Sequence, residues 1–269
     1  MDKPLFYLLL IMLIAGCKSS NDELSTSTFE IKPASQVEWE KLNPLRGDQS
    51  PQAGTLWGDR KNNQVPTGFL AKFVDGFSSP PHIHNATYRA VVINGLIHND
   101  DPSAAKMWMP TGSFWTQPKG EIHITSAKGN DCIALVEIDK GPYLVLPKKE
   151  NFVSGESPIN IVPGNIFWLD AKVSKENKVE IAYLWGKIEK ENGTFIKLPA
   201  GFSGQINSTS PVFRAVVITG AANHKKSTEQ LLPGSYFGST GSFTHNISTS
   251  EETIIYIRTK GEYTLKSSK

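Results

Sequence analysis

Three histidines in this sequence have the type and spacing of metal ligands. His82 and His84 stand two residues apart after two prolines, and His123 follows further along the chain. On an extended segment, side chains two positions apart project from the same face, so the imidazoles of His82 and His84 can reach one ion. Neutral imidazole nitrogens suit zinc, copper, iron and nickel. The alternative interpretation is that these are solvated loop histidines.

The residues around the histidines form two spaced motifs. The first, Gly76–Gly95, reads G-x5-H-x-H-x3-Y-x6-G, and the second, Gly112–His123, reads G-x5-P-x-G-x2-H. This spacing resembles the two motifs of the cupin superfamily, with Tyr88 where that family usually has glutamate and Ala127 where its second motif usually ends in asparagine. The resemblance implies that His123 comes from a neighbouring barrel strand. It also implies a three-nitrogen site with open positions for water or substrate.

The fourth ligand position is left open by Tyr88. A neutral phenol is a poor ligand, since its unperturbed pKa is about 10. Glu121 lies two residues before His123 and is expected to share its inward face, so we favour Glu121 as the fourth ligand over Gln117 or no fourth ligand. Tyr88 and Glu121 are also the candidate catalytic residues for moving a proton beside the metal. Tyr88 has a second interpretation, as a core aromatic.

An internal repeat divides the chain. Tyr88–Gly95 returns as Phe213–Gly220, and two further blocks, around Trp57 and Trp115, return in the same order around Trp185 and Phe237. Each unit is about the size of one domain. The sequence therefore predicts one barrel over residues 29–150, which carries the metal site, and a second over 151–269.

The second unit is expected to be degenerate. Applying the shift of the repeat places Asn207 and Thr209 where the first unit has His82 and His84, and only His123 has a counterpart, His245. We therefore expect His245 to be a hydrogen-bonded core or pocket residue. The repeated arginines, Arg89 and Arg214, indicate a shared structural role such as a buried ion pair or a cap on the barrel.

The elements that must position these residues are short strands. Segments such as 89–94 and 133–138 are β-branched and apolar, and the chain contains 22 glycines and 17 prolines for turns. The predicted fold class is all-β, with two tandem cupin barrels of the double-stranded β-helix or jelly-roll type. The 28 basic and 26 acidic residues are nearly balanced, which argues against a nucleic-acid partner.

The N-terminus predicts export. An apolar run too short to span a bilayer ends in Ile14-Ala-Gly-Cys17, which resembles a bacterial lipobox. We expect a signal peptide over 1–16, lipidation of Cys17, a flexible tether over 17–28 and a lipid-anchored protein of the bacterial cell envelope. The other cysteine, Cys132, lies in an apolar strand and is expected to be a buried, inert thiol.

The segments Pro80–Arg89 and Gly112–His123 resemble the DUF4437 family of bicupins, which implies a fold and a divalent metal, Fe²⁺ or Zn²⁺, with Mn²⁺ or Ni²⁺ as alternatives. Similarity to three-histidine cupins implies an iron(II) dioxygenase acting on a small organic molecule. Two alternatives stay open: a metal-dependent lyase or isomerase on organic or sugar acids, and a non-catalytic ligand-binding or sensor protein. A homodimer through the barrels is also compatible with this class.

Overall fold

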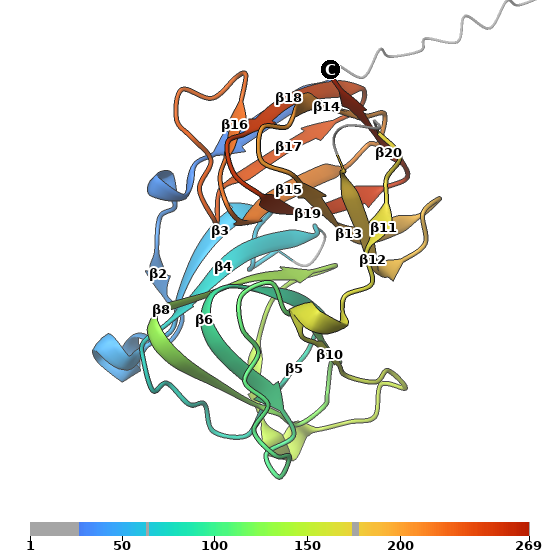
Figure 1. Cartoon of the computed structure of the whole chain (residues 1–269). Coiled ribbons are helices and arrows are strands. Elements are labelled where there is room, and N and C mark those ends of the chain that lie inside the picture. Colours follow the sequence, from blue (N-terminus) through green and yellow to red (C-terminus); the bar gives the residue numbers. More distant parts are fainter. Residues whose placement is uncertain (1–26, 63–64, 174–177, 269) are drawn as a thin grey trace, which may run out of the picture.

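The computed structural model describes residues 27–62, 65–173 and 178–268 (Figure 1). The predicted signal peptide, the lipidation site Cys17 and most of the predicted tether lie outside the described residues and stay predictions. No helix in the described part of the chain is long and apolar enough to cross a membrane.

The described residues form an all-β structure, as predicted, with antiparallel pairing throughout the named strands. One large sheet has the order β10 (Ile159–Ile161), β7 (Phe114–Gln117), β6 (Tyr88–Asp100), β8 (Ile124–Ile138), β4 (Thr67–Phe73), β3 (Gln52–Trp57) and β2 (Glu40–Lys41). The other has the order β1 (Thr28–Lys32), β17 (Tyr236–Thr240), β15 (Phe213–Thr219), β19 (Thr253–Lys260), β13 (Glu191–Leu198), β12 (Glu180–Gly186) and β11 (Leu169–Asp170).

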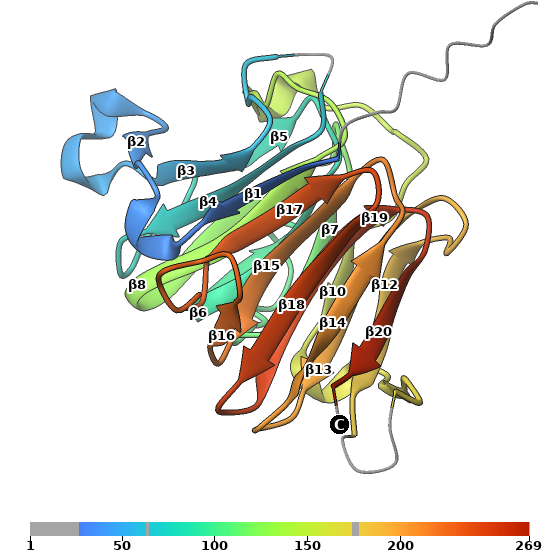
Figure 2. The ribbon, with the colours of Figure 1, turned by 90° about the horizontal axis from the view of Figure 1, so that it is seen from above.

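Two smaller sheets and four short helices complete the described part of the chain. The smaller sheets are β16 (Ala222–His224), β18 (Phe243–Thr249), β14 (Ser203–Ser208) and β20 (Tyr263–Ser267), and the pair β5 (His82–His84) with β9 (Val145–Pro147). The 3-10 helices are η1 (Ala34–Gln36), η2 (Pro44–Gln49), η3 (Lys148–Glu150) and η4 (Pro163–Asn165). Each large sheet faces a smaller one, so each half of the chain forms a barrel (Figures 1 and 2).

The long strands β6 and β8 bend to serve both faces of the first barrel. Their pairing register shifts on either side of Asn94, where the sheet turns. Gly95 has φ of 81°, and any side chain there would collide with the sulfur of Cys132. Glycine is therefore required at this bulge by both backbone conformation and space. Cys132 is free and buried, as predicted.

Each large sheet contains a strand from the other half of the sequence. β1 pairs with β17, and β10, which follows residue 150, pairs with β7 (Figure 2). The strand pairing therefore crosses the boundary that the repeat suggests between 29–150 and 151–269. Such an exchange ties the two halves together, because separating them would expose unpaired backbone on both large sheets.

The two large sheets also share a core. One cluster of buried apolar side chains takes Val91 and Leu135 from the first half and Val216 and Tyr256 from the second. Two further clusters fill the interiors of the individual barrels, and Tyr88 belongs to the one in the first barrel. The barrels are thus packed back to back through their large sheets.

A group of charged side chains lies at this interface. Arg89 makes a bidentate ion pair with Asp139, at 2.9 and 3.1 Å, and its guanidinium lies 3.8 Å from the ring centre of Trp185. Arg258, only 1% exposed, reaches from the second half to Asp139 and to fully buried Glu137. The ion pair predicted for Arg89 is confirmed, whereas Arg214 forms no ion pair with any described residue and donates to a backbone carbonyl.

Candidate metal centre

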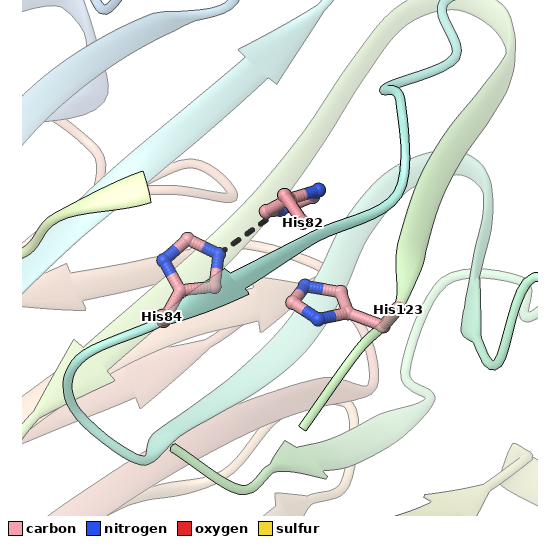
Figure 3. Close-up of side chains that lie close together, drawn as sticks. All are labelled: His82, His84 and His123. Atoms are coloured by element: carbon pink, nitrogen blue, oxygen red, sulfur yellow. Dashed lines mark hydrogen bonds between the residues drawn. The ribbon is translucent and has the colours of Figure 1, made fainter. Parts of the chain in front are cut away.

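Two of the three histidines lie on the short strand β5. His82 and His84 flank Ile83, whose side chain is fully buried on the opposite side. β5 pairs with β9, with His84 opposite Val145. The alternation of an extended strand therefore directs both imidazoles to one side, as the sequence predicts (Figure 3).

His123 approaches from the segment that leads into β8. It forms an antiparallel bridge with His82, in which each backbone N–H donates to the carbonyl of the other at 3.0 Å. The ring centres of His82 and His123 are 4.3 Å apart, and that of His84 lies 5.2 Å from His123. One ligand atom from each of the three residues lies within 4.8 Å of the others, and all three side chains are buried.

Hydrogen bonds fix which nitrogen of each ring faces the centre. The Nδ1 atoms of His82, His84 and His123 lie 2.9, 3.0 and 3.2 Å from backbone carbonyl oxygens. Because a carbonyl only accepts, each Nδ1–H donates, and each Nε2 carries a lone pair. Metal-binding histidines are oriented in this way by their outer nitrogen.

Among the described residues, the hydroxyl of Tyr143, 3.4 Å from the Nε2 atom of His84, is the only hydrogen-bond donor near the inner nitrogens. The Nε2 atoms of His82 and His84 are 3.2 Å apart, although with Nδ1 protonated neither has a hydrogen to donate (Figure 3). The Nε2 atom of His123 is buried with no hydrogen-bond partner among the described residues. A divalent cation would satisfy all three lone pairs at once, so the donor set fits a bound metal.

The surroundings keep the three imidazoles neutral. Burial lowers the pKa of His82 and, with the neighbouring histidines, holds that of His84 well below its usual value. Burial, followed by repulsion from His82, lowers the pKa of His123 to about 3. Protons therefore do not compete with a metal for these nitrogens near neutral pH.

The structure does not bring the carboxylate of Glu121, our favoured fourth ligand, to this cluster. Glu121 is exposed, and only its backbone carbonyl meets His123. The expectation failed because Glu121 belongs to the turn at Gly120, where φ is 77°, so the alternation of a strand does not apply to it. The amide of Gln117 is held by Asn99 and by the carbonyl of Glu121.

Tyr88 lies beside the cluster without joining it. Its ring is 5.2 Å from that of His84, and its hydroxyl donates to Asn99 at 2.9 Å. Burial raises the pKa of the phenol above its usual value, so Tyr88 stays protonated and is a poor general base. Tyr88 is thus both a core aromatic and part of the wall next to the histidines.

Replacement of Tyr88 by phenylalanine separates these roles. We expect Tyr88→Phe to retain the bound metal and to lower the free energy of unfolding by about 0.5–1.5 kcal/mol, the usual contribution of one hydrogen bond. The second barrel has phenylalanine, Phe213, at the corresponding place. Metal content by mass spectrometry and urea denaturation are the measurements. Loss of the metal in Tyr88→Phe would instead indicate that Tyr88 is a metal ligand.

Sequence reasoning missed Tyr143. Its ring stacks on that of His84 with a centre distance of 4.5 Å, and its hydroxyl lies 3.4 Å from the Nε2 atom. Burial raises the pKa of this phenol well above its usual value. Tyr143 lies in the segment that leads into β9. The sequence of this turn has no recognisable motif, so it could not have indicated the contact with His84.

A pocket of about 590 Å³ opens beside the histidines. His82, His84, Tyr88 and Tyr143 contribute to its wall, and most of the remaining lining is apolar or aromatic. The volume lies within the range of about 300–1,000 Å³ that is usual for sites that bind small organic molecules. The cluster is therefore placed where a bound small molecule can reach it.

The second barrel lacks this arrangement. In the strand pairing, His245 lies opposite Ile206, whereas His123 lies opposite His82, so His82 corresponds to Ile206 and His84 to Ser208. The predicted counterparts, Asn207 and Thr209, are wrong by one residue. The first barrel has an extra residue at Pro80-Pro81, between the bridges Ser78–Ser126 and His82–His123, and this bulge shifts the register.

His245 is hydrogen-bonded inside the second barrel, as predicted. Its Nδ1 atom lies 3.1 Å from the Nε2 atom of His224, and its Nε2 atom lies 3.1 Å from the hydroxyl oxygen of Ser239. Its ring stacks on Phe213 at 4.9 Å. Among the described residues, the second barrel offers no group of three metal-ligating side chains.

Two antiparallel barrels in tandem, with three histidines gathered inside the first, define the class of bicupins. The chain belongs to the DUF4437 family, described as a domain of unknown function, whose model matches residues 30–266. The family resemblance predicted from the histidine motifs is thereby confirmed. No curated protein matches the sequence.

Solved structures share the fold. A provisionally assigned dioxygenase from Nostoc punctiforme has a TM-score of 0.68 at 13% identity, covering 90% of this chain and 87% of that chain. Salicylate 1,2-dioxygenase from Pseudoaminobacter salicylatoxidans, solved as adducts with gentisate, has a TM-score of 0.57 at 11% identity, covering 90% and 85%. Oxalate decarboxylase from Bacillus subtilis has a TM-score of 0.55 at 12% identity, covering 88% and 78%. At these identities the likeness establishes the fold alone.

Proposed function

We propose that the protein is an iron(II) dioxygenase that cleaves a small organic molecule in the first barrel. The observation that carries the proposal is the convergence of three Nε2 lone pairs, each fixed by an Nδ1–H bond to a carbonyl, beside an apolar pocket whose wall includes His82 and His84. Bound ferrous iron would supply reductive activation of O₂ at this place. His82, His84 and His123 would hold it and leave coordination positions facing the pocket.

The lining of the pocket favours oxygen chemistry over proton transfer. Among the described residues that line it there is no aspartate, glutamate or lysine, and the pKa values of its two tyrosines, Tyr88 and Tyr143, are raised by burial. A lyase or isomerase needs a group that gains and loses a proton near the working pH. The three histidines are committed to the metal, so no side chain in the pocket meets that requirement. For this reason the dioxygenase is preferred to the metal-dependent lyase or isomerase.

Tyr143 and Tyr88 have defined tasks in this proposal. Both phenols remain protonated, and the hydroxyl of Tyr143 can donate a hydrogen bond that orients a substrate oxygen beside the histidines without taking a proton from it. The hydroxyl of Tyr88 already donates to Asn99, so Tyr88 contributes its ring to the pocket wall. The aromatic wall, which includes Trp115 and Phe69, excludes water from the reacting groups.

Oxygen consumption tests the proposal. The full chain, loaded with Fe²⁺ under nitrogen, is mixed with a panel of aromatic hydroxy acids, 1,3-diketones and thiols, and O₂ uptake is followed with an electrode. We expect at least one substrate to be consumed with one O₂ per molecule, and uptake to be lost in His84→Ala. The matched control is His224→Asn, which replaces a buried histidine of the second barrel. Asparagine is chosen because the first barrel has Asn99 at the position that corresponds to His224.

Turnover of a panel member at the same rate without O₂ would refute the dioxygenase and support the lyase instead. Tight Fe²⁺ binding with no consumption of any panel member would favour the non-catalytic alternative.

A further inference from the structure

We propose that the pocket takes an anion with a large apolar body, and that Arg46 binds its negative group. The proposal deepens the proposed function by naming a substrate class for the same pocket. It concerns ligand binding, however, and can be tested without turnover. Nothing in the three-histidine cluster itself requires Arg46.

The walls of the pocket suit a hydrocarbon or aromatic body. Phe69, Phe73, Phe77, Trp115 and Val136 are among the residues that line it. Apart from Arg46, the polar groups that the described residues contribute to the lining are hydroxyls, an amide and the histidines, and none of these residues carries a carboxylate. Burial of an apolar body against such walls is favourable, because it removes apolar surface from water.

Of the described residues that line the pocket, Arg46 alone carries a permanent charge. It lies on η2, and its guanidinium is placed 4.9 Å from the ring centre of Phe77. Its Nη2 atom makes a long hydrogen bond, 3.5 Å, to the carbonyl of Ser78, four residues before His82. The segment from Phe77 to His82 therefore connects the arginine with the metal centre along one side of the pocket.

Neighbouring cations have carboxylate partners, whereas Arg46 has none among the described residues. Lys41 pairs with Asp48 at 3.0 Å, and Arg60 pairs with Glu40. In the described part of the chain, no carboxylate forms an ion pair with Arg46. A guanidinium at the wall of an apolar pocket, without a counter-ion, can form a bidentate, charge-assisted pair with a carboxylate of a ligand.

Size and polarity together define the ligand. A volume of about 590 Å³ is far larger than a two-carbon acid requires, and the apolar walls offer nothing to a sugar acid, whose hydroxyls would lose their water. An acid with an aromatic or aliphatic body satisfies both Arg46 and the walls.

The test compares 4-phenylbutyrate with its uncharged primary amide by calorimetric titration of the full chain, metal-free and loaded with Zn²⁺. We expect the acid to bind roughly tenfold to a hundredfold more tightly than the amide, the range expected for hydrogen bonds to a charged group. Arg46→Met should remove this preference, and Arg46→Lys should retain part of it. The control Lys41→Met removes a nearby cation that lies outside the pocket lining and should bind as the unaltered protein does.

Oxalate supplies the opposite probe, a dianion without an apolar body, and it should bind the metal-free protein more weakly than 4-phenylbutyrate. Equal binding of acid and amide, an unchanged preference in Arg46→Met, or tighter binding of oxalate would overturn the inference. Arg46-dependent acid binding by a protein that takes up no iron when Fe²⁺ is supplied would refute the dioxygenase alone. Oxygen consumption without a preference for the acid would refute the inference alone.

Discussion

Replacement of His84 by alanine is expected to lower the affinity for a divalent metal by more than about 100-fold, since loss of a mere outer partner of a ligand already costs 10–100-fold. The Nε2 atom of His84 lies 3.2 Å from that of His82 and shares the centre with His123. With one of three nitrogens removed, the described residues offer no fourth ligand to replace it. Metal content after dialysis, measured by mass spectrometry, checks this result.

Two matched variants make the measurement specific. Tyr88→Phe alters a ring beside the cluster, and His224→Asn alters a buried histidine in the second barrel; both should hold about one ion per chain, as the unaltered protein should. Circular dichroism would establish that all three variants are folded. Equal metal content in His84→Ala and the unaltered protein would refute the proposed metal centre and, with it, the proposed dioxygenase.

The second large effect concerns stability. Replacement of Arg258 by methionine is expected to lower the free energy of unfolding by about 3–5 kcal/mol, because buried Glu137 is then left with only Arg89, which already pairs with Asp139, as a counter-charge. The two side chains are 1% and 0% exposed, their nearest charged atoms are 3.4 Å apart, and Arg89 lies 3.9 Å from the same carboxylate. Denaturation in guanidinium chloride measures the change.

A double variant and a surface control show whether the buried charge is the cause. Arg258→Met combined with Glu137→Leu should recover much of the loss, since replacing both members of a buried pair by apolar groups is often neutral. Lys41→Met breaks an ion pair whose side chains are 39% and 101% exposed, and should change stability little. If Arg258→Met lowered the free energy of unfolding no more than Lys41→Met does, the charged side chains at the interface would not contribute to stability as we expect.

The histidine ligands and the fold class could be predicted because both depend on local patterns. His82 and His84 share a face wherever their segment is extended, and short β-branched runs between turns form antiparallel strands. Glu121 shows where the same reasoning fails. It was placed by strand alternation, yet it lies in a turn, where backbone geometry no longer alternates.

The repeat was informative about duplication and less so about register. It identified Phe213 and His245 as counterparts of Tyr88 and His123, which the pairing of the strands supports. It misplaced the counterpart of His82 by one residue, because a bulge leaves the sequence spacing almost unchanged while it shifts the pairing. The exchange of β1 and β10 between sheets carries no signal in a repeat at all.

The sequence by itself determined which side chains can bind a metal, since residue type and a two-residue spacing are local properties. Only the tertiary structure decided that His123 pairs with His82, that Tyr143 stacks on His84, and that carbonyls fix all three imidazoles with Nε2 facing inward. The physical reason is that these contacts join segments far apart in the chain. Their geometry is set by how strands pair and bury their apolar faces, which no single segment encodes.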